Sequence, residues 1–278
     1  MHVRSQQALP APSALWNPWV AFFALILAAW VALFLLAAGH GDAATHGPGA
    51  QWVEPLFAVL PGEGTARGLH VHGLHSNLAL LLAMWSLMCV AMMAPTAVPL
   101  LRTYRHLSQG NPDRVSRLGF WALAMGHVVV WCGYSAVAAA AQSWLSNEGF
   151  LTSSGVSTST WLSVGLLAAA GAYQFSSLKE ACLSRCRSPM AFLLGHWRVG
   201  AGGAFRMGLR HGAFCVGCCW ALMALSFVGG TMNLLWMGAA MVLMIVEKLS
   251  LGRWLTAPIG IALLAAAAVT SVQTLGHL

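Results

Sequence analysis

The stretch RMGLRHGAFCVGCCWALM, residues 206–223, is mostly apolar, yet it contains one histidine and three cysteines. Successive residues of a helix are rotated by about 100°, which places His211, Cys215 and Cys218 within about 60° of one another. Cys219 lies at the edge of the same face. One helix is therefore predicted to present an imidazole and two or three thiols in one direction. That arrangement suits a soft metal ion or thiol redox chemistry.

The composition places this helix in a membrane. The chain of 278 residues is 58% hydrophobic and 8% charged, whereas a soluble domain usually carries about 25% charged residues. We therefore predict an all-α fold, a polytopic bundle of membrane helices forming a single transmembrane domain over residues 1–278. The net charge of +7 indicates basic cytoplasmic loops and not a nucleic-acid partner.

About seven apolar runs are predicted to cross the membrane, and a loop rich in Gly, Pro and His, residues 39–73, separates the first two. The predicted spans are residues 18–38, 74–101, 118–142, 161–178, 207–227, 232–246 and 255–275. If residue 1 is cytoplasmic, every Lys and Arg except Arg67 falls on the inner side. The positive-inside rule therefore predicts an inner N-terminus and an outer C-terminus, in the inner membrane of a bacterium.

Other soft ligands are predicted at the depth of the fifth-span cysteines. Met92 and Met93 lie near the inner end of the second span, where Pro95 is expected to kink or end the helix. His127 lies about nine residues inside the third span. Cys and Met favour Cu(I), and imidazole accepts copper or zinc. We assign the remaining methionines of these helices and two isolated cysteines to packing: Met84, Met88, Met237, Met241, Met244, Cys89 and Cys132.

Cys182 and Cys186 precede the fifth span on the same side of the membrane. Residues four apart share a helix face, so the pair can bind one metal ion or form a redox couple. We expect the nearby basic side chains to form a lipid-headgroup rim: Lys179, Arg185 and Arg187. Glu247 and Lys248 are expected to form an interfacial pair at the end of the sixth span.

Histidines are concentrated in the outer loop. His70, His72 and His75 form an H-x-H-x-x-H pattern, and His40 and His46 precede it. Closely spaced histidines can capture copper or zinc from the periplasm. The alternative interpretation is a polar loop without a metal.

Several short motifs together resemble a bacterial family of predicted metal-binding integral membrane proteins, the domain of unknown function 2182, over a core of about residues 80–250. The motifs are Met92-Met93-Ala94-Pro95; Tyr173-Gln174, Leu178-Lys179, Cys182, Cys186-Arg187 and Pro189; His211-Gly212, Cys215, Gly217-Cys218-Cys219-Trp220 and Met223; and Met232-Asn233, Trp236-Met237 and Glu247-Lys248. The resemblance implies metal binding and names no substrate. The first span, the histidine-rich loop and His127 lie outside the matching motifs.

These observations favour an integral membrane protein that handles copper, with zinc as the other metal considered. The candidate ligands are His211, Cys215, Cys218, Cys219, Cys182, Cys186, Met92, Met93 and His127. Besides the lipid bilayer, the expected partner is a copper enzyme or a periplasmic metal-binding protein. The sequence has no ATPase motif, and we expect no charged intramembrane residues of the kind a coupled carrier needs, which argues against active pumping.

Three other functions remain open. Vicinal Cys218 and Cys219, or Cys182 with Cys186, can in principle exchange thiols and disulfides with a quinone. The same ligands can also host a metal-centred oxidase or hydroxylase, so the sequence leaves open whether the protein is an enzyme. The third possibility is an assembly subunit of a larger membrane complex.

Overall fold

The structure is a computed structural model that describes residues 18–38, 78–108, 117–152, 154–250, 252 and 254–276. Within these residues the regular elements are helices, apart from an isolated bridge between Leu151 and Ser157. The helices are α1 (Pro18–Ala38), α3 (Leu78–Met93), η4 (Pro95–Ala97), α4 (Val98–Ser108), α5 (Arg117–Asn147), α6 (Thr160–Tyr173), α7 (Ser177–Arg187), α8 (Pro189–His196), α9 (Gly200–Ala224), α10 (Ser226–Gly229), α11 (Leu234–Leu249) and α12 (Thr256–Gly276).

Five stretches of helix are long and apolar enough to cross a membrane, which confirms a multi-pass, all-helical membrane protein. They are Pro18–Ala37, Leu78–Leu107, Leu118–Asn147, Gly200–Gly229 and Thr256–Leu275. The other two predicted spans correspond to α6, with 14 residues, and α11, with 16. At 1.5 Å per residue both are shorter than the hydrocarbon core of about 30 Å. The count of seven therefore stays a prediction.

The second span is broken where the sequence predicts it. α3 ends at Met93, and Pro95 begins the short 3₁₀ turn η4 before α4 continues the same apolar stretch. A proline inside a helix removes a backbone hydrogen bond and clashes with the preceding turn. The break brings Thr96 into the interior, where it is 8% exposed.

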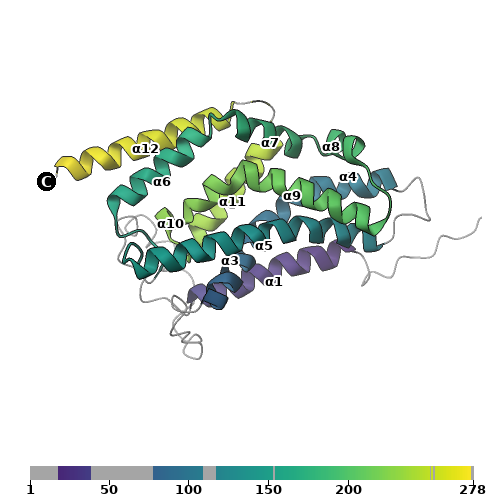
Figure 1. The fold of residues 1–278 in the computed structure, drawn as a ribbon, viewed down its shortest axis with the longest axis horizontal. Coiled ribbons are helices and arrows are strands. Elements are labelled where there is room, and N and C mark those ends of the chain that lie inside the picture. The colour runs from purple at the N-terminus through teal and green to yellow at the C-terminus, as the bar shows by residue number, and fades with distance from the viewer. Residues whose placement is uncertain are drawn as a thin grey trace, which may run out of the picture.

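α5 and α9 form the most extensive helix pair and lie side by side along the molecule (Figure 1). Glycines allow this approach. A Cβ on Gly126 of α5 would clash with the carbonyl oxygen of Phe205, and one on Gly208 of α9 would clash with the carbonyl oxygen of Leu123. Because the two backbones touch, the side chains next to these glycines face each other across a narrow interface.

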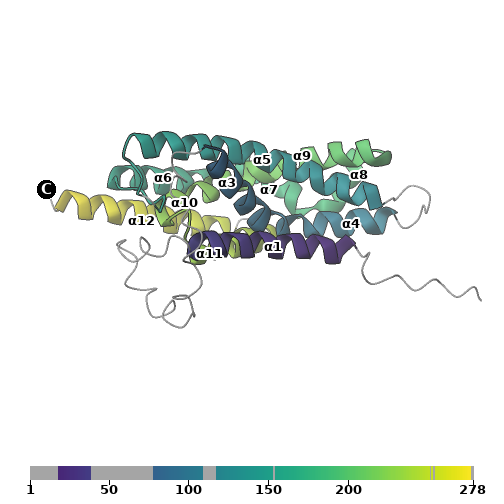
Figure 2. The ribbon, with the colours of Figure 1, turned by 90° about the horizontal axis from the view of Figure 1, so that it is seen from below.

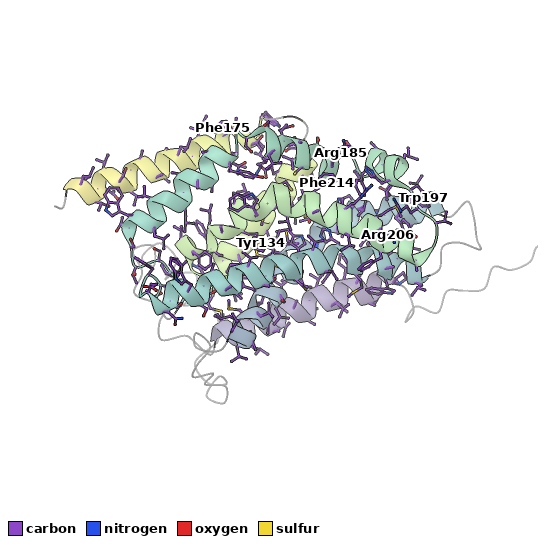
Figure 3. The ribbon with its side chains drawn as sticks, viewed as in Figure 1. Tyr134, Phe175, Arg185, Trp197, Arg206 and Phe214 are labelled. Atoms are coloured by element: carbon purple, nitrogen blue, oxygen red, sulfur yellow. The ribbon has the colours of Figure 1, made fainter. Side chains whose placement is uncertain are left out.

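The remaining helices surround this pair. α3 packs against both α5 and α1 and lies between them in the perpendicular view (Figure 2). α6 and α12 form a second pair at the other side of the molecule (Figure 1). Side chains fill the spaces between the ribbons, and Trp197 and Arg206 lie at the end of the bundle where α4 and α8 meet (Figure 3).

Candidate metal centre

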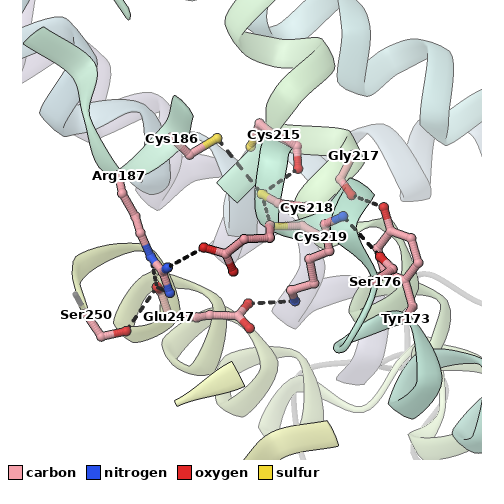
Figure 4. A network of polar contacts seen from close by, with 12 residues as sticks. Tyr173, Ser176, Cys186, Arg187, Cys215, Gly217, Cys218, Cys219, Glu247 and Ser250 are labelled. Carbon is pink, nitrogen blue, oxygen red and sulfur yellow. Dashed lines mark hydrogen bonds and ion pairs between the residues drawn. The ribbon is translucent and has the colours of Figure 1, made fainter. Parts of the chain in front are cut away.

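Four cysteine thiols meet where α7 packs against α9 (Figure 4). The Sγ atom of Cys218 lies 3.3 Å from Sγ of Cys219 and 3.9 Å from Sγ of Cys186. The thiol of Cys218 also donates to the carbonyl oxygen of Cys215 at 3.2 Å, one turn earlier on α9. The three cysteines of α9 are at most 1% exposed. We call these four residues the thiol cluster.

The sequence of α7 explains how Cys186 reaches this cluster. The Ser176 hydroxyl caps the helix by accepting a hydrogen bond of 3.1 Å from the amide of Lys179, and Pro189 begins the next helix. Cys182 and Cys186 share the face of α7 that meets α9, as predicted. Cys182 packs one turn away from the cluster, where a Cβ on Gly217 would come within 2.6 Å of its sulfur. Burial raises the pKa of the Cys182 thiol.

A buried ammonium group contacts the cluster. Nζ of Lys248 donates hydrogen bonds to Sγ of Cys215 at 3.0 Å and to Oγ1 of Thr96 at 2.9 Å. Thr96 in turn donates to the carbonyl oxygen of Met93 at 2.7 Å. A buried charge requires compensation by a partner of opposite charge or by hydrogen bonds. The sulfur and the hydroxyl are the acceptors that the described residues supply to Lys248.

A buried ion pair lies next to the ammonium group of Lys248. Nζ of Lys179 is 2.9 Å from Oε2 of Glu247, and both side chains are 1% exposed. The guanidinium of Arg187 donates to the carbonyl oxygen of Glu247 at 3.1 and 3.2 Å (Figure 4). The two basic residues thus hold the end of α11 against α7.

This arrangement corrects three expectations. Glu247 and Lys248 do not pair with each other, because adjacent helical residues point about 100° apart and each finds a partner on another helix. Lys179 does not belong to a headgroup rim, since it is buried in that ion pair. The expectation of no charged residues inside the bundle is also wrong.

His211 is paired with His127. Their Nδ1 atoms are 3.4 Å apart, and their ring centroids are 5.4 Å apart across the α5–α9 interface. His211 also contacts Phe192 of α8 edge-on, and the centroids of these two rings are 5.4 Å apart. The helical-face argument places His211 with the cysteines, but the structure makes it one member of a buried histidine pair one turn before Cys215.

Met92 and Met93 diverge, although they are adjacent in sequence. Met92 lines a small cavity between α3, α9 and α11 together with other methionines: Met88, Met223 and Met237. Met93 lines a different cavity, between α3 and α5, with Cys89 and His127. Neither cavity is lined by a thiol of the cluster, so the role of the two methionines as ligands of the same ion stays a prediction.

Within the ranges that the structure covers, no three His, Cys, Asp or Glu side chains are already arranged to hold a metal ion. An ion bound symmetrically by three sulfurs at about 2.3 Å would separate them by roughly 4 Å. The Cys186–Cys218 distance of 3.9 Å fits that value, whereas the Cys218–Cys219 distance of 3.3 Å is too short. Rotation of the Cys219 side chain is therefore needed to admit an ion.

Sequence reasoning did not identify Lys248 and Thr96 as neighbours of the thiols, or Lys179 as the partner of Glu247. The available signal was the position of Glu247 and Lys248 directly after an apolar run, together with the motif resemblance. The histidines of the outer loop lie outside the described residues.

The fold and these donors define a class: a multi-pass helical membrane protein with buried soft ligands. The chain belongs to the PpoB2 copper chaperone family, whose model matches residues 82–270. No curated protein and no solved structure matches the chain. Family membership confirms the predicted copper handling and delivery, and it implies a copper protein as the target.

Proposed function

We propose that the thiol cluster is the Cu(I) site from which this membrane copper chaperone delivers its ion. The observation that carries the proposal is the contact of four buried thiols from two helices with the buried ammonium group of Lys248. Thiolates bind soft ions such as Cu(I) but also bind zinc. The choice of copper over zinc at this site therefore rests on the copper chaperone family match over residues 82–270.

Charge supports the same conclusion. Two or three thiolates around Cu(I) carry a net negative charge, which is unfavourable in a water-poor interior. The ammonium of Lys248 lies 3.0 Å from one of the sulfurs and offsets part of that charge. Lys248 therefore acts as a fixed counter-ion for the copper-loaded cluster.

The other predicted ligands are proposed to serve the ion around this core. Cys182 lies one turn from Cys186 on α7 and offers an additional thiol on the path into the cluster. His211 lies on α9 itself, and His127 lies on α5, which packs against α9. Met92 and Met93 lie on α3, which packs against α5.

We propose that the protein has seven spans, with an inner N-terminus and an outer C-terminus, in the bacterial inner membrane. The arrangement of Lys and Arg supports this topology. With this topology the thiol cluster lies in the cytoplasmic half of the bilayer. We propose a copper enzyme or a periplasmic metal-binding protein as the recipient. The motif resemblance to the predicted metal-binding membrane family, the domain of unknown function 2182, is consistent with this function.

Thiol–disulfide exchange is the second candidate function. The distance of 3.9 Å between the sulfurs of Cys186 and Cys218, on different helices, favours it. Cys218 and Cys219 are adjacent, with Cα atoms about 3.8 Å apart, which is too close for an unstrained disulfide. Thiol trapping in intact cells distinguishes the two functions. A cysteine pair that cycles between oxidised and reduced forms supports exchange, and thiols that stay reduced while copper is delivered support the chaperone.

The proposed site is tested with the full-length protein in detergent, loaded with Cu(I) from a chelator complex under reducing conditions. The variant replaces Cys186, Cys215, Cys218 and Cys219 by Ser, and we expect it to lose the most tightly held copper. The matched control is Cys132→Ser, which removes a thiol of α5 that lies outside the cluster, on the wall of the cavity between α3 and α5, and should leave the most tightly held copper unchanged. Equal retention of tight copper by the fourfold variant and the wild type would rule out the thiol cluster.

A further inference from the structure

We propose that the cavity between α3 and α5 is a second Cu(I) site, whose ligands are Cys89, Met93 and Nε2 of His127. The proposal rests on the function proposed above, because it adds a second binding site for the same ion. The sequence patterns do not join these three residues. The structure brings them to one cavity wall.

The cavity has the size and lining that such a site requires. Its volume of about 10 Å³ is close to the space needed for one water-sized occupant. Cys89 and Met93 are one turn apart on α3, and His127 faces them from α5. A thiol, a thioether and an imidazole are donors that Cu(I) accepts.

His127 is held in an orientation that leaves one ring nitrogen for the cavity. The residue is 2% exposed, its Nδ1 contacts Nδ1 of His211, and its Nε2 is buried without a partner among the described residues. Two facing Nδ1 atoms can form a hydrogen bond only when one of them carries the proton. If His127 is the donor, its Nε2 has a free lone pair. His211 is then a positioning residue, in the role that outer partners have for metal-bound histidines.

Cys89 is the thiol ligand of the proposed site. It is 1% exposed, and its sulfur accepts a hydrogen bond of 3.2 Å from the hydroxyl of Ser135. When Cu(I) binds, the S–H bond of Cys89 breaks, an S–Cu bond forms and the proton is released. Met93 and His127 donate neutral lone pairs, so copper remains Cu(I).

The charge of this complex suits its location. One Cu(I) ion and one thiolate sum to zero, so the loaded site has no net charge to bury. This differs from the thiol cluster, where several thiolates face the ammonium of Lys248. Thr96 links the two sites, because its hydroxyl donates to the carbonyl oxygen of Met93 and contacts the sulfur of Cys215 at 3.7 Å.

A water molecule is the competing occupant. The indole nitrogen of Trp131 also lines this cavity region and is buried without a partner among the described residues, so one water could bridge it to His127. A water explains the two nitrogen atoms but makes no use of the sulfurs of Cys89 and Met93. Replacing one of those sulfurs therefore separates the two occupants.

The test uses the full-length protein in which the thiol cluster is already replaced by serines, so that remaining copper reports the second site. Cu(I) is supplied as a complex with a competing chelator. We expect about one weaker equivalent, with nitrogen and sulfur ligands in the copper X-ray absorption spectrum. Met93→Leu should weaken it by at least tenfold, since leucine keeps the volume and lacks sulfur. Met92→Leu, one residue away and on the other cavity, should not change it.

His127→Gln should remove the nitrogen ligand from the spectrum, and His211→Gln should weaken binding by about 10–100-fold without changing the ligand count. The same four variants are measured with the thiol cluster intact, where the second equivalent should respond in the same way. No second equivalent in either background, or equal effects of Met92→Leu and Met93→Leu, overturns the proposal. In that case, if tight copper binding is still lost when the thiol cluster is removed, the proposed function remains supported although the second site is ruled out.

Discussion

The ammonium of Lys248 on α11 lies 3.0 Å from the sulfur of Cys215 on α9, deep in the bundle. This contact joins α9 and α11, whose motifs are far apart in the sequence. It also gives the thiol cluster a positive neighbour that no solvent screens. The consequences for copper binding and for stability can be measured separately.

Replacing Lys248 by Met should weaken Cu(I) binding while keeping the length of the side chain. A hydrogen bond to a charged group contributes about 1.5–3 kcal/mol, which corresponds to roughly 10–100-fold in affinity. Chelator competition measures the change. Thr96→Val removes the second acceptor of Lys248 but keeps the charge, so it should have a much smaller effect. Similar losses of Cu(I) affinity in the two variants would show that the charge of Lys248 does not contribute to copper binding.

The buried Lys179–Glu247 pair should be important for stability. Lys179→Met leaves a buried carboxylate without its partner, a change that costs about 3–5 kcal/mol in proteins. The double variant Lys179→Met, Glu247→Gln should recover much of that loss, because neither charge remains. Thermal unfolding in detergent measures both. If the double variant is as unstable as the single one, the ion pair is not the source of the effect.

The glycine contact between α5 and α9 should tolerate no side chain. Gly126→Ala introduces a Cβ that clashes with the carbonyl of Phe205, and overpacking of this kind costs about 1–3 kcal/mol. Gly133 lies on the same helix, and a Cβ added there would have no neighbouring atom within 4 Å. Gly133→Ala is therefore the matched control and should be neutral or stabilising. An unfolding temperature that falls equally in both variants would contradict the close approach.

Cys182 and Cys186 should behave differently despite sharing a helix face. Cys186→Ser should lose tight copper, because Cys186 contacts Cys218. Cys182→Ser should retain most of it, because Cys182 packs against Gly217. Since burial raises the pKa of Cys182, its thiolate is scarce at neutral pH, and its alkylation should accelerate only at a higher pH than that of an ordinary exposed cysteine. Mass spectrometry of the alkylated protein measures the rate.

The sequence predicts the helices well and their side-chain contacts less well. Apolar runs and Pro95 locate the spans and the break after α3, because length and backbone sterics are local properties. The clustering of Cys215, Cys218 and Cys219 follows from helical geometry for the same reason. The partners of Lys248 depend on how α11 is rotated against α9, and a single sequence does not specify that rotation.

Met92 and Met93 show the same limit. Depth along a helix is predictable from residue number, but adjacent residues point about 100° apart, so equal depth does not mean a common site. His211 is a second example, because its direction is decided by the glycine contact that brings His127 against it.

The charged end of α11 also has a consequence for how the protein is made. A lysine at the centre of a membrane helix opposes insertion by about 2.5–3.5 kcal/mol, and one near the end opposes it less. Glu247 and Lys248 lie in the last turn of α11, a helix of only 16 residues. Lys179 and Cys215, their partners, precede α11 in the chain. During synthesis both partners therefore emerge from the ribosome first, and α11 enters the bilayer with the groups that neutralise it already in place.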